Sequence, residues 1–410
     1  MQSIKRYILL TALVVMTFPL KGLAEDAPLT VADSLQERNA SEGVRFSLLT
    51  CTPGTDAYAH FGHTAILAVD ERTGKRDVYN YGCFDSSQKN FVLNFIKGDT
   101  NYLLEAESEH FFLWRYSENG NGVTQQELNL TAEEALHLKS LLEENVRPEN
   151  QTYLYNWLYD NCTERARDVI EEAVGGTIVY EREERNVTAR EMLHEKLRNA
   201  PWLCLGIDLL LGEEIDTVIG RRTQMFIPDY YKSEIDSAVI VAANGERRPL
   251  VKATSIMLEE SEKNRETPSP LSPVVVFSAL LFAAVLLSAM DVRRRKSSVW
   301  FDMLLHTAQG LAGIVIAYLF FFSKHPAVDS NWQVVLFNPL ALCYAAWMVT
   351  CAMKGKTNRL AIANLAVCLG FVIIMLTVRQ SFHPAVWLMA LTLLVRSIVN
   401  LPLNTFKRNK

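Results

Sequence analysis

The feature that most constrains this chain is a change in composition near Pro270, from a charged sequence to a largely apolar one. Most charged residues come before it, and five long apolar stretches come after it. A helix needs roughly 20 apolar residues to cross a bilayer, and each stretch is close to that length. We therefore expect a soluble domain followed by an all-α, five-helix transmembrane domain, with spans at Leu271–Met290, Val299–Phe322, Val334–Met353, Leu360–Val378 and Ala385–Leu403.

The positive charge of the connecting segments differs between the two sides of the predicted membrane. Ten Lys and Arg residues lie on the side of the C-terminus, whereas the other side has only Lys324 and Arg379. Positive residues concentrate in cytoplasmic loops. The C-terminus is therefore predicted to be cytoplasmic, and the N-terminal domain to face outward.

The first residues agree with that orientation. Residues 1–24 are typical of a signal peptide: Lys5 and Arg6 precede a short apolar run, and small residues follow at Gly22-Leu23-Ala24. An uncleaved anchor is the alternative. We predict a signal peptide over 1–24, an exported domain over 25–265 and the transmembrane domain over 266–410.

Composition narrows the class of protein further. The chain is 49% hydrophobic with a net charge of −5, which argues against a disordered chain and against nucleic-acid binding. Four of the seven cysteines, Cys51, Cys83, Cys162 and Cys204, lie in the exported part. An oxidising compartment favours bridges between such residues, but their spacing does not select the pairs.

The exported domain begins with strands and continues with helices. Thr131 and Glu134 form a capping-box pattern for a helix to about Val146. A second helix is expected from Asp160-Asn161-Cys162 to Gly175-Gly176. Because there is no βαβ alternation, we expect an α+β domain. The expected strands are Val44–Cys51, Thr64–Val69, Asp77–Phe84, Tyr102–Tyr116 and Val123–Leu130; Phe91–Lys97 is expected as a short helix, and Trp202–Leu211 as an apolar helix of the core or the membrane surface.

Two segments carry residues suited to nucleophilic chemistry. His63 follows Gly62 at the start of a strand, and Cys162 lies in the first turn of the second helix. The positive end of a helix favours the thiolate, which is the reactive form of cysteine. A nearby histidine would act as base, and helix-start N–H groups could hold an oxyanion. A purely structural role for Cys162 is the alternative. The spacing of His60, His63, Cys51 and Cys83 matches no standard metal-binding pattern, so no metal is expected.

The order of these segments resembles a known superfamily. A histidine strand that precedes a cysteine helix is similar to the circularly permuted branch of the NlpC-type, papain-like thiol enzymes, such as the lecithin:retinol acyltransferase group. The segments 48–54, 61–65, 79–82 and 160–163 resemble more closely the Bacteroides-type lipoprotein N-acyltransferases, which also have five C-terminal spans. This resemblance covers nearly the whole chain after the signal and implies a bacterial inner-membrane protein with a periplasmic domain.

The resemblance implies roles for particular residues. Cys162 would be the acyl-accepting nucleophile and His63 its base, with Tyr81 and Asn161 near the substrate. Asn80 is the expected third, orienting residue. A hairpin turn centred on Thr73-Gly74 would pair His63 with Phe84, so a bulge or a shifted register is needed to bring Asn80 close. Asp160 and Asp85 are the rival candidates.

The implied reaction needs no cofactor. An acyl chain would move from a phospholipid to Cys162 as a thioester, and then to the α-amino group of a diacylglyceryl-cysteine at a lipoprotein N-terminus. A cell-wall cysteine peptidase or amidase and a non-enzymatic membrane scaffold are the alternatives.

The predicted spans contain several polar residues that are either functional or turned toward water: Asp302, His306, Gln309, Arg396 and Asn400. Three further polar residues at the outward side could meet a lipid headgroup: His325, Asn331 and Asn338.

Overall fold

A computed structural model describes residues 43–56, 59–84, 91–262 and 271–405. The predicted signal peptide, Asp85 and the linker 263–270 lie outside these residues. The signal peptide and the domain boundaries therefore stay predictions.

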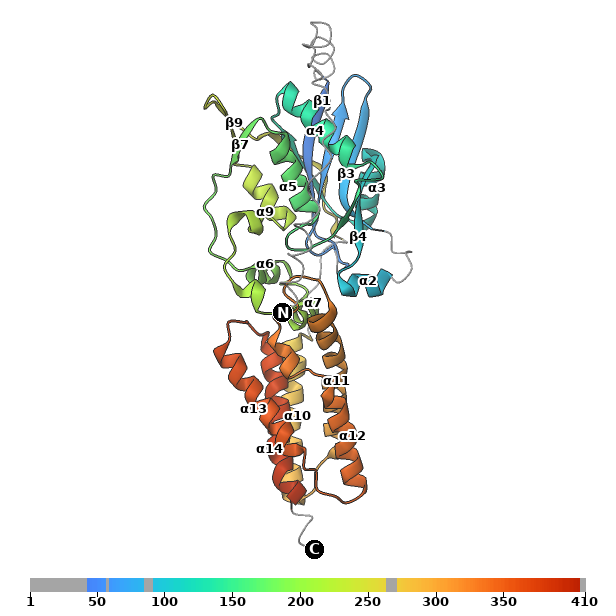
Figure 1. The fold of residues 1–410 in the computed structure, drawn as a ribbon, viewed down its shortest axis with the longest axis vertical. Helices are drawn as coiled ribbons and strands as arrows, with labels where there is room; N and C mark the ends of the chain where they lie inside the picture. The colour runs from blue at the N-terminus through green and yellow to red at the C-terminus, as the bar shows by residue number, and fades with distance from the viewer. Residues whose placement is uncertain (1–42, 57–58, 85–90, 263–270, 406–410) are drawn as a thin grey trace, which may run out of the picture. The chain divides into compact units, whose positions relative to one another are not determined.

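The N-terminal domain is a mixed α and β domain built on one antiparallel sheet of seven strands (Figure 1). The order is β10-β5-β1-β2-β3-β4-β6, so the strands β1 (Val44–Cys51), β2 (His63–Asp70) and β3 (Lys75–Cys83) lie in the middle. Side chains alternate between the two faces of a strand, yet Leu48 and Leu49 of β1 are both fully buried. Both faces of the sheet are therefore covered.

Helices on the two faces provide that cover. Helices α4 (Ala132–Asn145), α5 (Cys162–Ala173) and α9 (Pro228–Ile235) pack on the face that contains Leu48. Helix α3 (Glu109–Asn119) packs on the opposite face through Phe112. The site described below lies where the ends of β2 and β3 meet the start of α5.

Helix α3 corrects the expected long strand over Tyr102–Tyr116. Strand β4 ends at Ser108, whose side chain accepts a hydrogen bond from the Phe111 N–H and so begins a helix. The helix ends at Gly120, whose φ of 77° is the left-handed conformation that favours glycine. The apolar residues of this segment favour a strand, but the residues at the start and end of the helix decide its structure.

The two helices predicted after residue 130 are present. The Thr131 side chain and the Glu134 side chain form the reciprocal capping box at the start of α4. Asn161 caps α5, which ends at Ala173 just before Gly175-Gly176. The structure also confirms the short helix expected over Phe91–Lys97, which is α2 (Phe91–Lys97), the strand expected over Val123–Leu130, which is β5 (Val123–Leu128), and the helix expected over Trp202–Leu211, which is α7 (Pro201–Leu210). The other elements of the domain are β4 (Asn101–Ser108), β6 (Thr152–Leu154), β7 (Gly176–Val179), α6 (Ala189–Lys196), η2 (Glu213–Asp216), α8 (Arg221–Gln224), β8 (Val239–Ala242), β9 (Arg247–Pro249) and β10 (Val251–Leu258).

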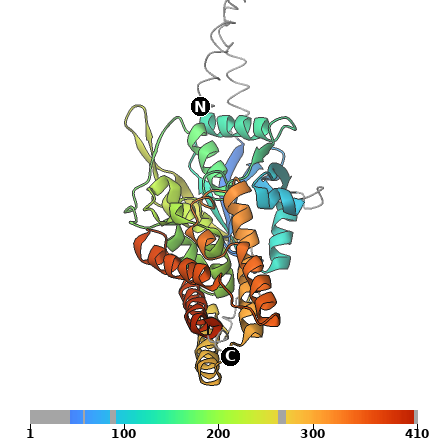
Figure 2. The same cartoon turned by 60° about the horizontal axis from the view of Figure 1, so that its bottom comes forward.

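The C-terminal region is helical. Among the described residues, four helices are long and apolar enough to cross a membrane, where five spans were expected. The fourth expected stretch forms α13, whose 17 residues make it shorter than these four spans, in which η4 and α12 count as one. Helices α10 and α14 run side by side (Figures 1 and 2). The helices are α10 (Pro273–Arg294), α11 (Val299–Phe322), α12 (Leu340–Met353) preceded by the short η4 (Trp332–Val335), α13 (Ala361–Thr377) and α14 (Pro384–Thr405).

A buried ionic cluster joins three of these helices. The Arg396 side chain of α14 is fully buried and bonds Asp302 of α11 at 2.6 Å and Asp291 of α10 at 2.8 Å. Ser288 and Asn400 complete the cluster through bonds to Arg396 and Asp302. These charged groups face protein and do not reach toward water, because a charge exposed to lipid is costly.

The N-terminal domain contacts the helical region at several places, two of which involve α2 and α7. Helix α2 is fixed beside the end of α11, because Ser323 donates to the Ile96 carbonyl at 2.9 Å and Lys324 pairs with Asp99 at 2.6 Å. Helix α7 packs through Leu205 against residues of α11 and α13, and the Trp202 indole donates to the Leu271 carbonyl at 2.7 Å.

Candidate active site

Three predicted residues come together at one end of the sheet. His63 is the first residue of β2, Cys162 is the first residue of α5, and Asn80 lies on β3. His63 Nε2 donates a hydrogen bond to Asn80 Oδ1 over 2.6 Å. The imidazole also hydrogen-bonds the Cys162 thiol, and Nδ1 is the ring nitrogen left for that contact. The result is a continuous Cys-His-Asn chain.

A shift of two residues in strand register brings Asn80 within reach. The ladder pairs Ile66 with Tyr79 and Asp70 with Lys75, so the same register places Gly82, not Phe84, opposite His63. The turn therefore comprises residues 71–74, and Gly74 takes a φ of 70° in its last position. The centre of the turn lies one residue earlier than the expected Thr73-Gly74. A shift of one residue in the turn changes the cross-strand partner by two residues, from Phe84 to Gly82.

Asn80 is held in the orientation that this chain needs. Its Nδ2 donates to Glu107 Oε1 at 3.0 Å, and Arg115 donates to both oxygens of Glu107. A carboxylate can only accept from the amide nitrogen, so the amide oxygen must face His63. The rival Asp160 is instead paired with Arg165 at 2.6 Å.

The electrostatics of the pair favour a charged thiolate and imidazolium. Burial raises the pKa of the Cys162 thiol, but the facing His63, the Thr64 N–H and the Thr163 hydroxyl outweigh it, so the pKa lies below its ordinary value. Burial lowers the pKa of His63, but the Cys162 thiolate and the Asn80 bond bring it above its ordinary value. Each partner stabilises the charge of the other.

Two further residues border the thiol and were not assigned a role from the sequence. A side chain on Gly82, whose φ is 88°, would lie 3.4 Å from Cys162 Cβ, 3.7 Å from His63 Cε1 and 3.9 Å from the Tyr153 hydroxyl. The Tyr153 hydroxyl is buried and has no hydrogen-bond partner within the described part of the chain. Both residues thus border a small space between nucleophile and base.

The two predicted substrate-binding residues lie elsewhere. Asn161 Oδ1 accepts from the N–H groups of Thr163 and Glu164, while its Nδ2 donates to the Trp157 and Phe226 carbonyls at 2.9 Å. Both N–H groups are therefore engaged and unavailable to an oxyanion. Tyr81 is buried in the core with its hydroxyl accepting from Asn145 at 3.0 Å. Contact of either with substrate remains a prediction.

All seven cysteines are free thiols. Cys51, the cross-strand partner of His63, is fully buried, and burial raises the pKa of its thiol. Burial likewise raises the pKa of Cys83, to about 12. Both remain protonated at neutral pH, whereas the pKa of Cys162 is lowered, so its thiol is the one of these three prepared for nucleophilic attack.

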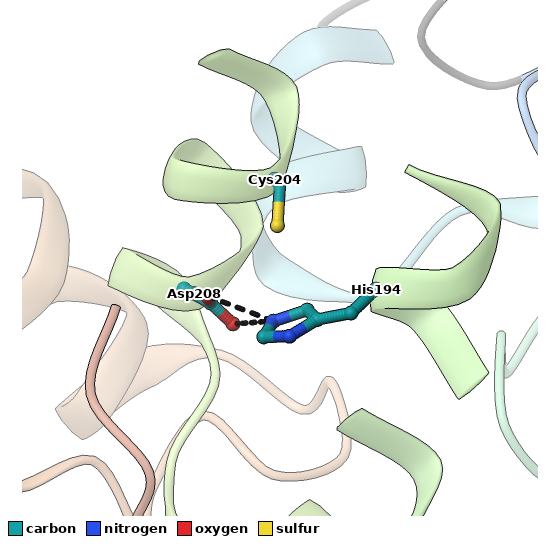
Figure 3. Close-up of side chains that lie close together, drawn as sticks. All are labelled: His194, Cys204 and Asp208. Carbon is teal, nitrogen blue, oxygen red and sulfur yellow. Dashed lines mark hydrogen bonds and ion pairs between the residues drawn. The ribbon is translucent and has the colours of Figure 1, made fainter. Parts of the chain in front are cut away.

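A second group of titratable side chains lies on α6 and α7 (Figure 3). His194, Cys204 and Asp208 bring ligand-type atoms within 4.8 Å of one another. His194 Nε2 lies 2.9 Å from both carboxylate oxygens of Asp208, and this carboxylate, together with Cys204, raises the pKa of His194 to about 10. Arg190 also bonds Asp208 at 2.6 Å. Since two cationic partners already satisfy this carboxylate, we assign the group to a polar network and not to a metal site.

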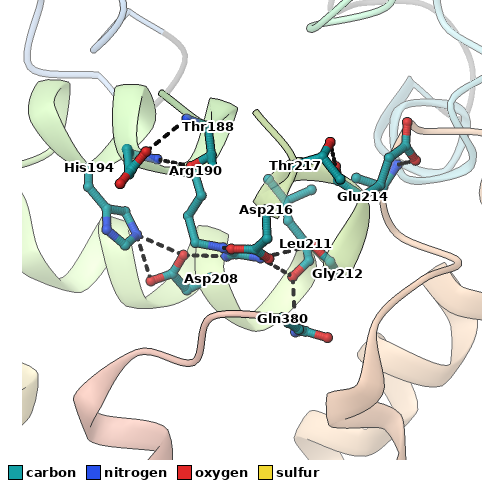
Figure 4. A network of polar contacts seen from close by, with 12 residues as sticks. Thr188, Arg190, His194, Asp208, Leu211, Gly212, Glu214, Asp216, Thr217 and Gln380 are labelled. Atoms are coloured by element: carbon teal, nitrogen blue, oxygen red, sulfur yellow. Dashed lines mark hydrogen bonds and ion pairs between the residues drawn. The ribbon is translucent and has the colours of Figure 1, made fainter. Parts of the chain in front are cut away.

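That network extends toward the transmembrane region (Figure 4). Arg190 lies between Asp208 and Asp216, and all three side chains are buried. The Arg190 guanidinium also donates to the carbonyls of Leu211 and Gly212, while Gln380, beyond α13, donates to the Leu211 carbonyl at 3.4 Å. The network therefore fixes the segment between α7 and η2 against the outward end of the helices.

Comparison with known proteins agrees with this architecture. The chain matches the family model described as the Lnb N-terminal periplasmic domain over residues 32–195, and the one described as the Lnb transmembrane domain over residues 263–408. No curated protein and no solved structure matches it. The two matches cover most of the chain and indicate an inner-membrane protein whose N-terminal part is periplasmic. The chain therefore belongs to the Lnb-type lipoprotein N-acyltransferase family.

Proposed function

We propose that this protein transfers an acyl chain from a phospholipid to the α-amino group of a lipoprotein's diacylglyceryl-cysteine through a thioester on Cys162. The observation that carries the proposal is the hydrogen-bonded chain from Cys162 through His63 to Asn80. Family membership supports the reaction class. We further propose a cytoplasmic C-terminus, from the asymmetry of positive charge.

The first step forms the acyl-enzyme. The Cys162 thiolate attacks the ester carbonyl carbon, the carbon–oxygen bond breaks, and the His63 imidazolium gives its proton to the departing lysophospholipid oxygen. The Tyr153 hydroxyl and the Cys162 backbone N–H are the donors we assign to the transient oxyanion. The support for Tyr153 is its buried hydroxyl, which has no other partner in the described residues.

The second step releases the acyl chain to the acceptor. The neutral α-amine attacks the thioester carbonyl, neutral His63 takes the proton that the amine loses, and the Cys162 thiolate departs as the amide forms. The thiolate–imidazolium pair is thereby restored. Asn80 keeps the imidazole in one orientation through both steps. The histidine strand, neighbouring orienting residue and cysteine helix also support a permuted papain-like fold, which we propose for this domain.

Mass spectrometry of lipoprotein N-termini tests the proposal. In cells that lack the protein, the wild type should add a third acyl chain, and Cys162→Ala should not. Cys204→Ala is the matched control, because Cys204 is another free thiol beside a histidine, and it should keep full activity. Purified enzyme with phospholipid should carry an acyl adduct on the peptide that contains Cys162.

The same measurements separate the two alternatives. A cell-wall peptidase or amidase would change peptidoglycan fragments and leave lipoproteins with two acyl chains. A non-enzymatic scaffold would keep its cellular activity with Cys162→Ala. Either result would reject the transferase.

A further inference from the structure

A cavity of about 430 Å³ lies apart from the Cys162 site. It is bordered by η2, by Phe320 near the outward end of α11, by the segment 329–335, and by Arg379 just after α13. Both helices end within a few residues of it, so the cavity lies at the level where lipid headgroups meet water.

The lining combines an apolar surface with charges of both signs. Phe320, Val335 and Trp332 contribute the apolar part. Arg379 and Asp329 are exposed, and neither forms an ion pair with another described residue. A cation and an anion that both lack partners thus border the same cavity, an arrangement complementary to a zwitterion.

The other two carboxylates of the cavity are already held by neighbours. Glu213 accepts from the Trp332 indole at 2.8 Å, and Glu214 accepts from the Tyr159 hydroxyl at 3.2 Å. Tyr159 precedes Cys162 by three residues, so the Cα atoms of the two residues lie at most about 11 Å apart. The cavity is thus connected to the segment that carries the nucleophile.

The three residues expected from the sequence to meet a headgroup already have hydrogen-bond partners, although Asn331 also lines the cavity. Asn331 donates to the Leu209 carbonyl, His325 bonds the Phe95 carbonyl, and Asn338 donates to the Val335 carbonyl. The structure therefore directs attention from these three side chains to the charged residues of the cavity.

We propose that this cavity binds the headgroup of a zwitterionic phospholipid that serves as the acyl donor. Arg379 binds the phosphate and Asp329 the ammonium group, while Phe320 and Val335 contact the ethanolamine methylene groups, so that the glycerol esters extend out of the cavity toward Cys162. This inference rests on the proposed function. It adds a headgroup preference to the reaction: phosphatidylethanolamine should be a better donor than phosphatidylglycerol, which lacks the ammonium group.

Steady-state kinetics of the full-length protein in mixed micelles test the assignment. Arg379→Gln should raise the apparent KM for phosphatidylethanolamine by about tenfold, as expected for one lost charge-assisted contact, with kcat changed less than about twofold. Asp329→Asn should raise that KM but leave the KM for phosphatidylglycerol unchanged. Arg359→Gln is the matched control, because Arg359 is an exposed arginine at the opposite end of α13, and it should change neither.

A binding measurement keeps this inference separate from the proposed function. With the Cys162→Ala protein, brominated phosphatidylethanolamine should quench the fluorescence of Trp332, measured as the difference from a Trp332→Phe variant. Arg379→Gln should weaken that quenching about tenfold. Quenching that is independent of Arg379, or an increase in the KM for the lipoprotein acceptor only, would overturn the headgroup site even if the enzyme is an acyltransferase. If the wild-type protein transfers no acyl chain but the Arg379-dependent quenching is observed, the proposed function and the donor role are rejected. The cavity would then still be a lipid-binding site.

Discussion

His63 uses both ring nitrogens, and the two contacts have separable consequences. Contact with Cys162 places the proposed base beside the proposed nucleophile, whereas contact with Asn80 fixes the ring and raises the pKa of His63. The reactive ion pair exists above the lowered pKa of the thiol and disappears as pH rises through the raised pKa of the imidazole. Activity should therefore follow a bell-shaped pH profile.

Asn80→Ala should move the alkaline limb of that profile to lower pH, because the bond that raises the pKa of His63 is lost. We also expect kcat to fall by about 10- to 100-fold, since the ring loses its orientation. Asn80→Asp, which keeps an acceptor and adds a negative charge, should move the limb to higher pH. An alkaline limb that stays in place in both variants would show that Asn80 does not act on His63.

Gly82→Ala should reduce acyl transfer through contact with the site, beyond its effect on stability. A φ of 88° costs an alanine about 1–2 kcal/mol, and the added methyl would lie 3.4 Å from Cys162 Cβ. Gly245 is the matched control because its φ is 84° and nothing lies within 4 Å. Gly245→Ala should lose similar stability, measured by thermal unfolding, and keep its activity. Equal activities of the two variants would contradict a role for the space beside Gly82.

The sequence motifs predicted that Cys162, His63 and Asn80 form one site, and the structure brings the three side chains together, but the strand register that does so was not predicted. Asn80 comes close only because the hairpin turn lies one residue earlier than expected. Tyr153 and Gly82 had no recognisable signal, because an unpaired buried hydroxyl and a close backbone approach are properties of tertiary structure.

Helix α5 depends on one side chain for the position of its nucleophile. Asn161→Ala should destabilise the domain by about 1–2 kcal/mol, because two helix N–H groups and two carbonyls lose their partner. It should also lower kcat, as the first turn carries Cys162. Thr188→Ala removes the cap of α6 and should cost similar stability without loss of activity. Kinetics and thermal unfolding of both variants test this, and unchanged kcat in Asn161→Ala would refute it.

Glu164 in the same helix makes stability depend on pH. Burial raises the pKa of this carboxyl to about 7 despite Arg167 at 3.8 Å. A carboxyl whose folded pKa exceeds its unfolded value costs stability at high pH, and the cost disappears as pH falls below the unfolded value of about 4.3. Glu164→Gln should therefore raise the free energy of unfolding at pH 8 by about 1–3 kcal/mol and change it little at pH 4. Glu133→Gln, in the exposed first turn of α4, should have no such effect; a variant less stable than wild type at pH 8 would contradict the assignment.

Helices α4 and α5 were predictable because capping residues mark where they start, whereas α3 and the shortest strands were not predicted. The capping box at Thr131 and the cap before Cys162 located α4 and α5. Helix α3 was read as a strand because its aromatic residues favour strands, although Ser108 and Gly120 mark its ends. The three- and four-residue strands β7, β8 and β9 are too short for alternation to be read reliably.

At the scale of the whole molecule, the ionic cluster around Arg396 connects α10, α11 and α14. Arg396→Ala should destabilise the detergent-solubilised protein by about 3–5 kcal/mol, because two buried carboxylates lose their common partner. Adding Asp291→Asn and Asp302→Asn should recover part of that loss. Arg293→Ala, at an exposed position in the last turn of α10, is the control and should unfold like the wild type. A single variant as stable as the wild type would show that the cluster is dispensable.

The positions of the apolar stretches could be predicted from the sequence, although only four of the described helices, not five, are long and apolar enough to cross a membrane. The pairing of the helices could not be predicted. Hydropathy located α10 to α14 to within a few residues. It could not reveal that Arg396 lies inside the bundle, since this depends on how the helices pack.

The shielding of the sulfur has a further consequence for the fate of the acyl-enzyme. Cys162 is only 9% exposed, so bulk water has little access to a thioester formed there. If the proposed intermediate forms, its lifetime should be long enough to wait for a scarce acceptor that diffuses in the plane of the bilayer. The same enclosure would make wasteful hydrolysis of donor lipids slow whenever newly exported lipoproteins are lacking.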